Sequence, residues 1–241
     1  MFLAGKKALI TGGGRGIGRA IACALANEGV EIALLARTEK QLESVAELIG
    51  QKTKVVCITA DLNELAKLPK VFEEIQQSLG PIDLLINNAG TGAHRPFLKG
   101  ELADWVWTLN VNLIAGMYLA QLALPHMMAK QEGAIINIAS MAGKMGLKDS
   151  AAYCASKFGV VGFSQALFEE VREHNIKVCA ICPGYVDTPL IPKTPSLDRQ
   201  KMIAPEDVAQ TVLQVLQMNA RVCPTEIILR PQRSPYATHS S

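Results

Sequence analysis

The sequence has little excess charge of either sign. Its 24 lysines and arginines nearly balance its 22 aspartates and glutamates, which leaves a formal net charge of +2. Nucleic acids and anionic membranes attract strongly basic surfaces, so neither is expected as a partner. No apolar stretch approaches the ~20 residues of a membrane span, and the apolar start is too short for a secretory signal. We therefore expect a soluble, cytoplasmic protein.

Clustered cysteines and histidines are also lacking. The six cysteines are scattered through apolar segments, as small buried hydrophobic residues usually are. Cys179 and Cys182 have C-x-x-C spacing, but within a strand this spacing turns the two side chains to opposite faces. Buried thiols are therefore favoured over a redox or metal pair. The four histidines show no ligand spacing, so no metal site is expected.

Short β-branched segments do recur, separated by longer amphipathic ones. The strand-like segments are residues 6–11, 31–36, 54–59, 83–87, 134–140, 177–182 and 225–230. Near-continuous apolar strands that alternate with helices predict a parallel sheet covered on both faces. We expect an α/β fold, a single doubly wound (Rossmann) domain over residues 1–230 with a seven-stranded, mainly parallel sheet. Residues 231–241 are expected to form a mobile tail.

Ligands of such sheets bind at the carboxyl ends of the strands. The segment TGGGRGIG, Thr11 to Gly18, follows the first strand and opens a helix. Its glycines let the backbone approach a pyrophosphate, which the positive end of the helix can bind. A tight turn without a ligand is the alternative, but the position between strand and helix favours a dinucleotide.

Five motifs share their order and spacing with a known family. They are Thr11-Gly12-x-x-x-Gly16-Ile17-Gly18, Asn87-Asn88-Ala89-Gly90, Ser140, Tyr153-x-x-x-Lys157 and Pro183-Gly184. This set resembles the signature of the short-chain dehydrogenase/reductase family, from residue 4 to about residue 230. The resemblance implies a dinucleotide-dependent oxidoreductase acting on CH–OH or C=O groups.

Most of the residues expected to contact the cofactor follow from this resemblance. Arg15 and Arg37 are added because of their charge, which is considered in the next paragraph. The full set is Gly12, Gly14, Arg15, Gly16, Ile17, Gly18, Arg37, Asp61, Leu62, Asn88, Ala89, Gly90, Tyr153, Lys157, Pro183, Gly184, Val186 and Thr188. Asp61 could instead cap a helix. The prolines around Thr188 could serve only to shape a loop.

The end of the second strand bears on the choice between NAD and NADP. An acidic residue there would bind the ribose 2′-hydroxyl of NAD, but the position holds Ala36, followed by Arg37. Arg15 lies in the glycine-rich turn. Guanidinium groups offer forked, charge-assisted donors to a 2′-phosphate, so NADP(H) is predicted. The alternative is that both arginines are ordinary solvated surface residues.

Tyr153 and Lys157 lie four residues apart, which places them on one face of a helix. Reduction of a carbonyl needs a proton for the developing alkoxide, and a phenol can supply it. A neighbouring ammonium should lower the phenol pKa from its usual value of about 10. By itself the pair could be accidental.

Two further residues complete the expected catalytic set. Ser140 should hold the substrate carbonyl. A nucleophilic serine is the competing interpretation, but the glycine at the front of a nucleophile elbow is missing. The resemblance implies that Asn112 holds a water that relays protons past the lysine. Asn110 and a plain helix-surface role are the alternatives.

Residues 91–100 and 189–205 should select the substrate. The expected substrate is a small-molecule carbonyl, either free or bound to an acyl carrier protein. Lys130 and Arg172 could form a basic landing site for such a carrier, or they could be ordinary solvated cations on helix surfaces. The C-terminus resembles sepiapterin-reductase-like proteins more than 3-oxoacyl-(acyl-carrier-protein) reductases, so a pteridine or diketone substrate stays open. We expect a homodimer or homotetramer; a non-catalytic dinucleotide-binding regulator is the alternative of another class.

Overall fold

The computed structural model describes residues 1–92 and 95–236. Its sheet has seven strands in the order β3-β2-β1-β4-β5-β6-β7, and every strand pair is parallel. The strands are β1 (Lys7–Thr11), β2 (Glu31–Ala36), β3 (Val55–Thr59), β4 (Leu84–Asn87), β5 (Gly133–Ile138), β6 (Ile176–Pro183) and β7 (Glu226–Leu229). The predicted doubly wound fold is confirmed, and each expected segment forms a strand.

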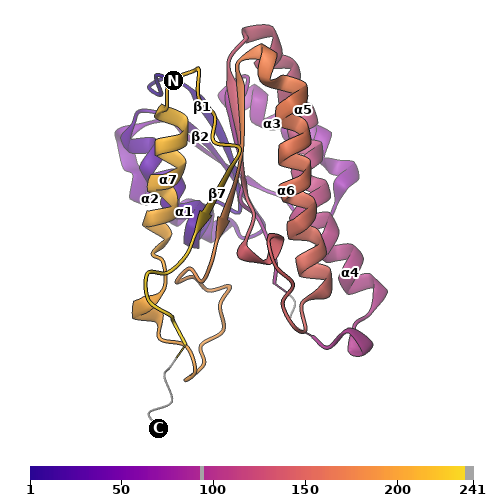
Figure 1. The fold of residues 1–241 in the computed structure, drawn as a ribbon. Coiled ribbons are helices and arrows are strands. Elements are labelled where there is room, and N and C mark those ends of the chain that lie inside the picture. The colour runs from indigo at the N-terminus through magenta and orange to yellow at the C-terminus, as the bar shows by residue number, and fades with distance from the viewer. Residues whose placement is uncertain (93–94, 237–241) are drawn as a thin grey trace.

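Helices cover both faces of the sheet. One face carries α1 (Gly16–Asn27), α2 (Glu39–Ile49) and α7 (Pro205–Gln217); the other carries α3 (Leu68–Leu79), α4 (Leu102–Leu109), α5 (Ala115–Lys130) and α6 (Ala151–Val171) (Figure 1). Each layer packs its own apolar core against the sheet. The strand order reverses between β1 and β4, which is where ligands bind in such folds.

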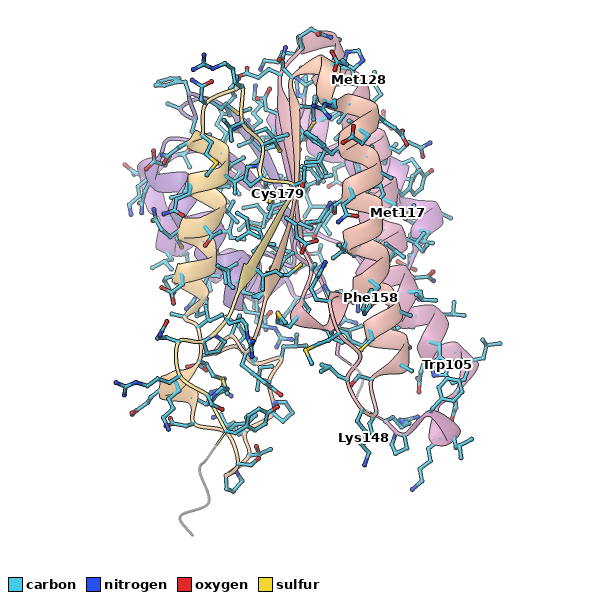
Figure 2. The ribbon with its side chains drawn as sticks, in the orientation of Figure 1. Trp105, Met117, Met128, Lys148, Phe158 and Cys179 are labelled. Atoms are coloured by element: carbon cyan, nitrogen blue, oxygen red, sulfur yellow. The ribbon has the colours of Figure 1, made fainter. Side chains whose placement is uncertain are left out.

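The strands are apolar on both sides because helices cover both sides. Every residue of β6 is buried, and its side chains alternate between the two helical layers. Cys179 packs in the core that contains α1 and α7, whereas Cys182 packs with Val160 and Val161 of α6. Figure 2 shows Cys179 between the two helical layers. Burial raises the pKa of Cys179 to about 12 and that of Cys182 to about 11. The predicted opposite facing of these thiols is confirmed.

One helix departs from the expectation that no segment could span a membrane. α4, a π-helical turn at Asn110–Ile114 and α5 form one helix of 29 residues, Leu102–Lys130, whose best window has a mean hydropathy of 1.2. Length and composition alone would allow it to cross a membrane. A single such helix is weak evidence, because helices of a protein core pass the same test. Its face with Ala115, Leu119 and Ala123 is buried in the core under α3 and α6.

The mobile tail was expected to begin at residue 231, but residues just beyond this point still contact the rest of the domain. Pro235 is buried, and its carbonyl oxygen accepts a hydrogen bond from the Asp198 amide at 2.7 Å. Tyr236 pairs with Leu197 in an antiparallel bridge. The segment 231–236 therefore packs onto the loop that follows β6, while residues 237–241 lie outside the described residues.

Candidate active site

The sheet topology brings the expected site residues to one edge. β1, β4, β5 and β6 are consecutive neighbours and all parallel, so their carboxyl ends lie side by side. The glycine-rich turn follows β1, Asn88 follows β4, Ser140 follows β5, and Pro183 ends β6. Tyr153 and Lys157 come to the same edge from the first turns of α6. His94, within the expected 91–100 segment, lies outside the described residues.

The turn before α1 depends on glycine. Gly12 has φ +66°, and a Cβ there would lie 2.9 Å from the Ala89 Cα. Gly16 also has positive φ, at +54°, and borders the Thr188 side chain. The first turn of α1 contains no acidic residue and receives no side-chain cap from Arg15. Amide groups at this helix start therefore remain directed at the sheet edge, as anion binding requires.

Gly18 is the most tightly enclosed of these glycines, and its replacement by Ala should disrupt the turn. The added Cβ would lie 2.3 Å from the Gly12 carbonyl oxygen and 2.6 Å from Asn88 Nδ2. We expect a loss of about 1–3 kcal/mol in the free energy of unfolding, measured with urea, and weaker dinucleotide binding. Gly162→Ala is the control: a Cβ there meets nothing within 4 Å, and the helix should gain up to about 1 kcal/mol. Equal stability of the two variants would contradict the close fit of the turn.

Asn88 holds the glycine-rich turn in place. Its Nδ2 donates to the Thr11 carbonyl at 2.9 Å and to the Gly12 carbonyl at 3.3 Å, and its amide donates to Thr11 Oγ1 at 3.0 Å. The Ala89 amide donates to the same hydroxyl. The Thr11 hydroxyl thus links β1 to the end of β4 through hydrogen bonds. The sequence alone did not predict this role for Thr11.

The end of β2 presents cations and no carboxylate. Ala36 is half-buried, and Arg37 and Arg15 are exposed. The Arg37 guanidinium lies over the ring of Trp107, 6.0 Å from its centroid, so α4 supports this arginine from outside the sheet. Asp61 does not cap a helix; its Oδ1 accepts from the Asn63 amide at 2.9 Å in a local turn. Leu62 beside it is buried.

Tyr153 and Ser140 interact at the end of β5. Burial raises the pKa of the Tyr153 phenol, and a hydrogen bond with Ser140 opposes this rise only in part. The phenol pKa is therefore raised and not lowered as expected, because loss of solvation is the largest effect on it. The Lys157 ammonium lies 5.9 Å from the centroid of the Tyr153 ring. A raised pKa keeps the phenol protonated at neutral pH.

Lys157 is buried, with only 4% of its surface exposed. Its Nζ donates to the Ile138 carbonyl at 2.9 Å, at the last residue of β5. Desolvation lowers its pKa to about 8. Gly90 lies beside both Lys157 and Asn112, since a Cβ on Gly90 would lie 3.6 Å from Lys157 Nζ and 3.5 Å from Asn112 Oδ1.

The lowered pKa of Lys157 predicts a pH-dependent stability. The pKa is about 8 in the folded chain and 10.5 in the ordinary side chain, so between these values the unfolded chain binds more protons. Stability contributed by Lys157 should therefore rise as pH increases from about 8 to 10.5. Urea unfolding of the parent and of Lys157→Met at pH 7.5 and pH 9.5 isolates this group, because other titrations cancel in the difference. A difference that stays constant or falls would contradict the lowered pKa.

Asn112, rather than Asn110, faces the site. Its Oδ1 accepts from the Thr91 amide at 2.8 Å, and its Nδ2 donates to the Thr91 carbonyl and to Ser156 Oγ, both at 3.0 Å. Asn110 instead donates to Asn63. Ser156 Oγ also donates to the Tyr153 carbonyl at 2.7 Å, so it links Asn112 to the catalytic turn of α6. Ser156 was not predicted from the sequence. Its position three residues after Tyr153 on the same helix is the only sequence feature that links it to the site.

A small cavity lies beneath Asn112. Its volume is about 20 Å³, and its polar lining comes from Thr11, Asn87, Asn112 and Asn137. Such a volume accommodates about one water molecule. A polar cavity beside Asn112 is compatible with the water-holding role expected for this residue.

The segment after β6 closes the site on another side. The Gly184 amide donates to the Leu229 carbonyl at 2.8 Å, and buried Val186 pairs with Ile203. Thr188 is buried against Gly16. Arg199, which sequence reasoning missed, donates to Asp187 Oδ1 at 2.6 Å, and to the carbonyls of Thr188 and Ile191 at 2.9 and 3.2 Å. No motif marked this arginine; only the folded loop identifies it.

Lys130 and Arg172, the residues considered for a basic landing site, each form an ion pair within the chain. Lys130 Nζ pairs with Asp83 at 2.5 Å, and this hydrogen bond raises its pKa. Arg172 pairs with Glu169 at 3.0 Å. Both cations precede the amino ends of strands, at the edge of the sheet opposite to Ser140. Both cations therefore lie at the edge of the sheet opposite to the candidate chemistry.

Comparison with known proteins agrees with this geometry. A family model described as short chain dehydrogenase matches residues 6–197. Uncharacterized oxidoreductases of Staphylococcus saprophyticus and Staphylococcus aureus are 35% and 34% identical to the chain, over 94% and 95% of its length and 97% and 98% of theirs.

Solved structures share the whole fold. A metagenomic short-chain oxidoreductase in complex with NADP superposes with a TM-score of 0.84 at 30% identity, covering 97% of this chain and 100% of that one. An actinorhodin polyketide ketoreductase variant with NADPH gives 0.86 at 28% identity, covering 94% and 95%. The family match spans well over half of the sequence, and the chain therefore belongs to the short-chain dehydrogenase/reductase family of oxidoreductases.

Proposed function

We propose that this protein uses NADPH to reduce a carbonyl group, a ketone or 3-oxoacyl group, to an alcohol. The observation that carries the proposal is the meeting of Ser140, Tyr153 and Lys157 at the end of β5. Tyr153 has a hydrogen bond with Ser140, and Lys157 is anchored on the Ile138 carbonyl. This set lies at the sheet edge where the glycine-rich turn would hold a dinucleotide.

The residues present fit NADP(H). Any side chain on Gly12 or Gly18 would collide with Ala89 or the turn itself, so glycine at these positions permits the tight turn from β1 into α1 on which a pyrophosphate would lie. Arg15 and Arg37 supply positive charge where NAD would require a carboxylate. Two structural neighbours contain NADP or NADPH. When bound, the nicotinamide supplies the hydride that reduces the carbonyl carbon.

The side chains would then protonate and stabilise the carbonyl oxygen of the substrate. Tyr153 is kept protonated by its raised pKa and gives its proton to the carbonyl oxygen as negative charge develops there. Ser140 donates a hydrogen bond to the same oxygen. Lys157, charged below its pKa of about 8, stabilises the phenolate that Tyr153 becomes. Asn112 and the adjoining small cavity hold the water through which the proton is replaced.

A carbonyl panel tests the proposal. NADPH oxidation should be followed with an acetoacetyl thioester, a pterin bearing a side-chain ketone, a diketone and a simple aldehyde. Turnover of at least one, with alcohol formed in equal amount to NADPH consumed, is expected. Tight NADPH binding without turnover of any would favour a dinucleotide-binding regulator and overturn the proposal. The relative rates distinguish a 3-oxoacyl substrate from a pteridine or diketone.

Location and assembly complete the proposal. Six free cysteines fit a reducing cytoplasm. Met117 and Phe158 are exposed on α5 and α6, where Figure 2 labels them, and an exposed apolar face of this kind supports a homodimer or homotetramer. Light scattering coupled to size-exclusion chromatography measures the assembly directly.

A further inference from the structure

The loop after β6, residues 184–204, is held in place by contacts at two points. Arg199 fixes its first half, because the guanidinium binds Asp187 and the carbonyls of Thr188 and Ile191. This half also contacts the glycine-rich turn through Thr188 and Gly16. Arg199 itself belongs to the loop, so this clamp persists whatever happens to the C-terminus. It secures the part of the loop nearest the proposed cofactor.

The second hold comes from the C-terminal segment 231–236, which we call the C-terminal brace. The Asp198 amide donates to the Pro235 carbonyl at 2.7 Å, and Tyr236 forms a bridge with Leu197. Pro231 lies beside Gly184, since a Cβ on that glycine would be 3.0 Å from Pro231 Cδ. The brace therefore contacts both the start and the far half of the loop. In Figure 1 the yellow C-terminal chain runs down from β7 to meet the orange loop.

A pair of phenols forms the centre of this contact. The hydroxyl oxygens of Tyr185 and Tyr236 are 2.7 Å apart, and the two rings meet edge to face with centroids 5.6 Å apart. Tyr185 directly follows Pro183 and Gly184, at the end of the strand that neighbours β5. A hydrogen bond between two phenols uses one hydroxyl hydrogen and leaves the other available to a further acceptor. The pair thus fixes the position of Tyr185, two residues after the carboxyl end of β6.

We propose that Tyr236 and the C-terminal brace position Tyr185 and the far half of the loop, and thereby determine which carbonyl substrates bind. This inference rests on the proposed reductase function. Because Arg199 keeps the cofactor side of the loop in place, loss of the brace should affect the substrate and leave NADPH binding almost intact. A merely structural role would weaken both together.

Two truncations separate these outcomes. A chain ending at Arg230 lacks the brace, whereas a chain ending at Tyr236 keeps it and is the matched control. We expect the shorter chain to show a KM for the best carbonyl raised tenfold or more, with smaller differences among carbonyls. Its Kd for NADPH should change less than twofold. Unchanged KM values, or equal losses in KM and NADPH affinity, would overturn the proposal.

Single hydroxyl deletions test the phenol pair without shortening the chain. Tyr236→Phe and Tyr185→Phe each keep the ring and remove one hydrogen bond, for which a change in KM of about three- to tenfold is expected. The double variant should be no worse than the more damaging single one, because both act on the same contact. Multiplying effects would show that the two hydroxyls act separately and would overturn the paired role.

Proteolysis measures the brace without any enzymatic activity. Lys193 lies in the exposed tip of the loop and is a trypsin site. Cleavage after Lys193 should be several-fold faster in the chain ending at Arg230 than in the chain ending at Tyr236. Equal cleavage rates would show that the brace does not hold the loop. If cleavage differs but no carbonyl is reduced by the full chain, the proposed function fails while the brace stands.

Discussion

Tyr153→Phe should lower the turnover number for carbonyl reduction by about 10²- to 10⁴-fold, the usual contribution of a positioned general acid. The variant keeps the aromatic ring and loses only the hydroxyl that donates the proton. The Kd for NADPH should change less than threefold, because Lys157 keeps its own anchor on the Ile138 carbonyl. Single-turnover kinetics at saturating NADPH separate the chemical step from binding.

Tyr118→Phe is the matched control for this experiment. Tyr118 lies on α5 and packs partly buried against the core that α3, α5 and α6 share. Its hydroxyl has no part in the proposed chemistry, so turnover should stay within about twofold of the parent. Activity in Tyr153→Phe comparable to that of Tyr118→Phe would exclude Tyr153 as the proton donor.

Reversal of the cofactor preference is the second large effect expected. The parent should use NADPH more efficiently than NADH by well over tenfold, since one lost charge-assisted hydrogen bond is worth ~1.5–3 kcal/mol. Ala36→Asp would repel the 2′-phosphate and offer an acceptor to a 2′-hydroxyl, and Arg37→Ala would remove the attraction. The double variant should prefer NADH. The ratio of kcat/KM for the two cofactors is the measurement.

Salt and a control arginine make this test specific. The parent's preference for NADPH should shrink as ionic strength rises, because Arg37 is exposed and its charge is screened. Arg19, also exposed, lies on α1 one turn beyond Arg15, and Arg19→Ala should leave the preference unchanged. Equal use of both cofactors by the parent at low salt would show that Arg15 and Arg37 are solvated surface residues.

The order of strands and helices could be predicted because local and global requirements coincide. A strand buried on both faces must be apolar throughout, so segments such as 31–36 and 177–182 stand out from amphipathic helices in the sequence alone. The glycine-rich turn was visible for a similar reason: glycine adopts the positive φ of Gly12 without strain, and a side chain cannot fit the close approach at Gly18.

Interactions between distant residues could not be predicted in this way. Lys130 looked like a free cation until folding placed Asp83 beside it, and Tyr153 looked like a phenol tuned by charge until burial raised its pKa. Spacing along the chain carries no information on solvation or on partners 47 residues away. The same holds for Ser156 behind Asn112, whose contact crosses from one helix to another.

The C-terminal segment differs most between what its sequence predicts and what the tertiary structure shows. By itself the sequence determined where the last strand ends, because the apolar run of β7 stops at Leu229 and polar residues with prolines follow. Such a composition has no core of its own and is typical of a mobile end. Only the tertiary structure decided otherwise for residues up to Tyr236, since the parallel order of β6 and β7 brings this segment beside the loop after β6. There the Pro235 carbonyl accepts a hydrogen bond from the Asp198 amide, and the Tyr236 hydroxyl pairs with that of Tyr185. These partners lie 37 and 51 positions earlier in the chain.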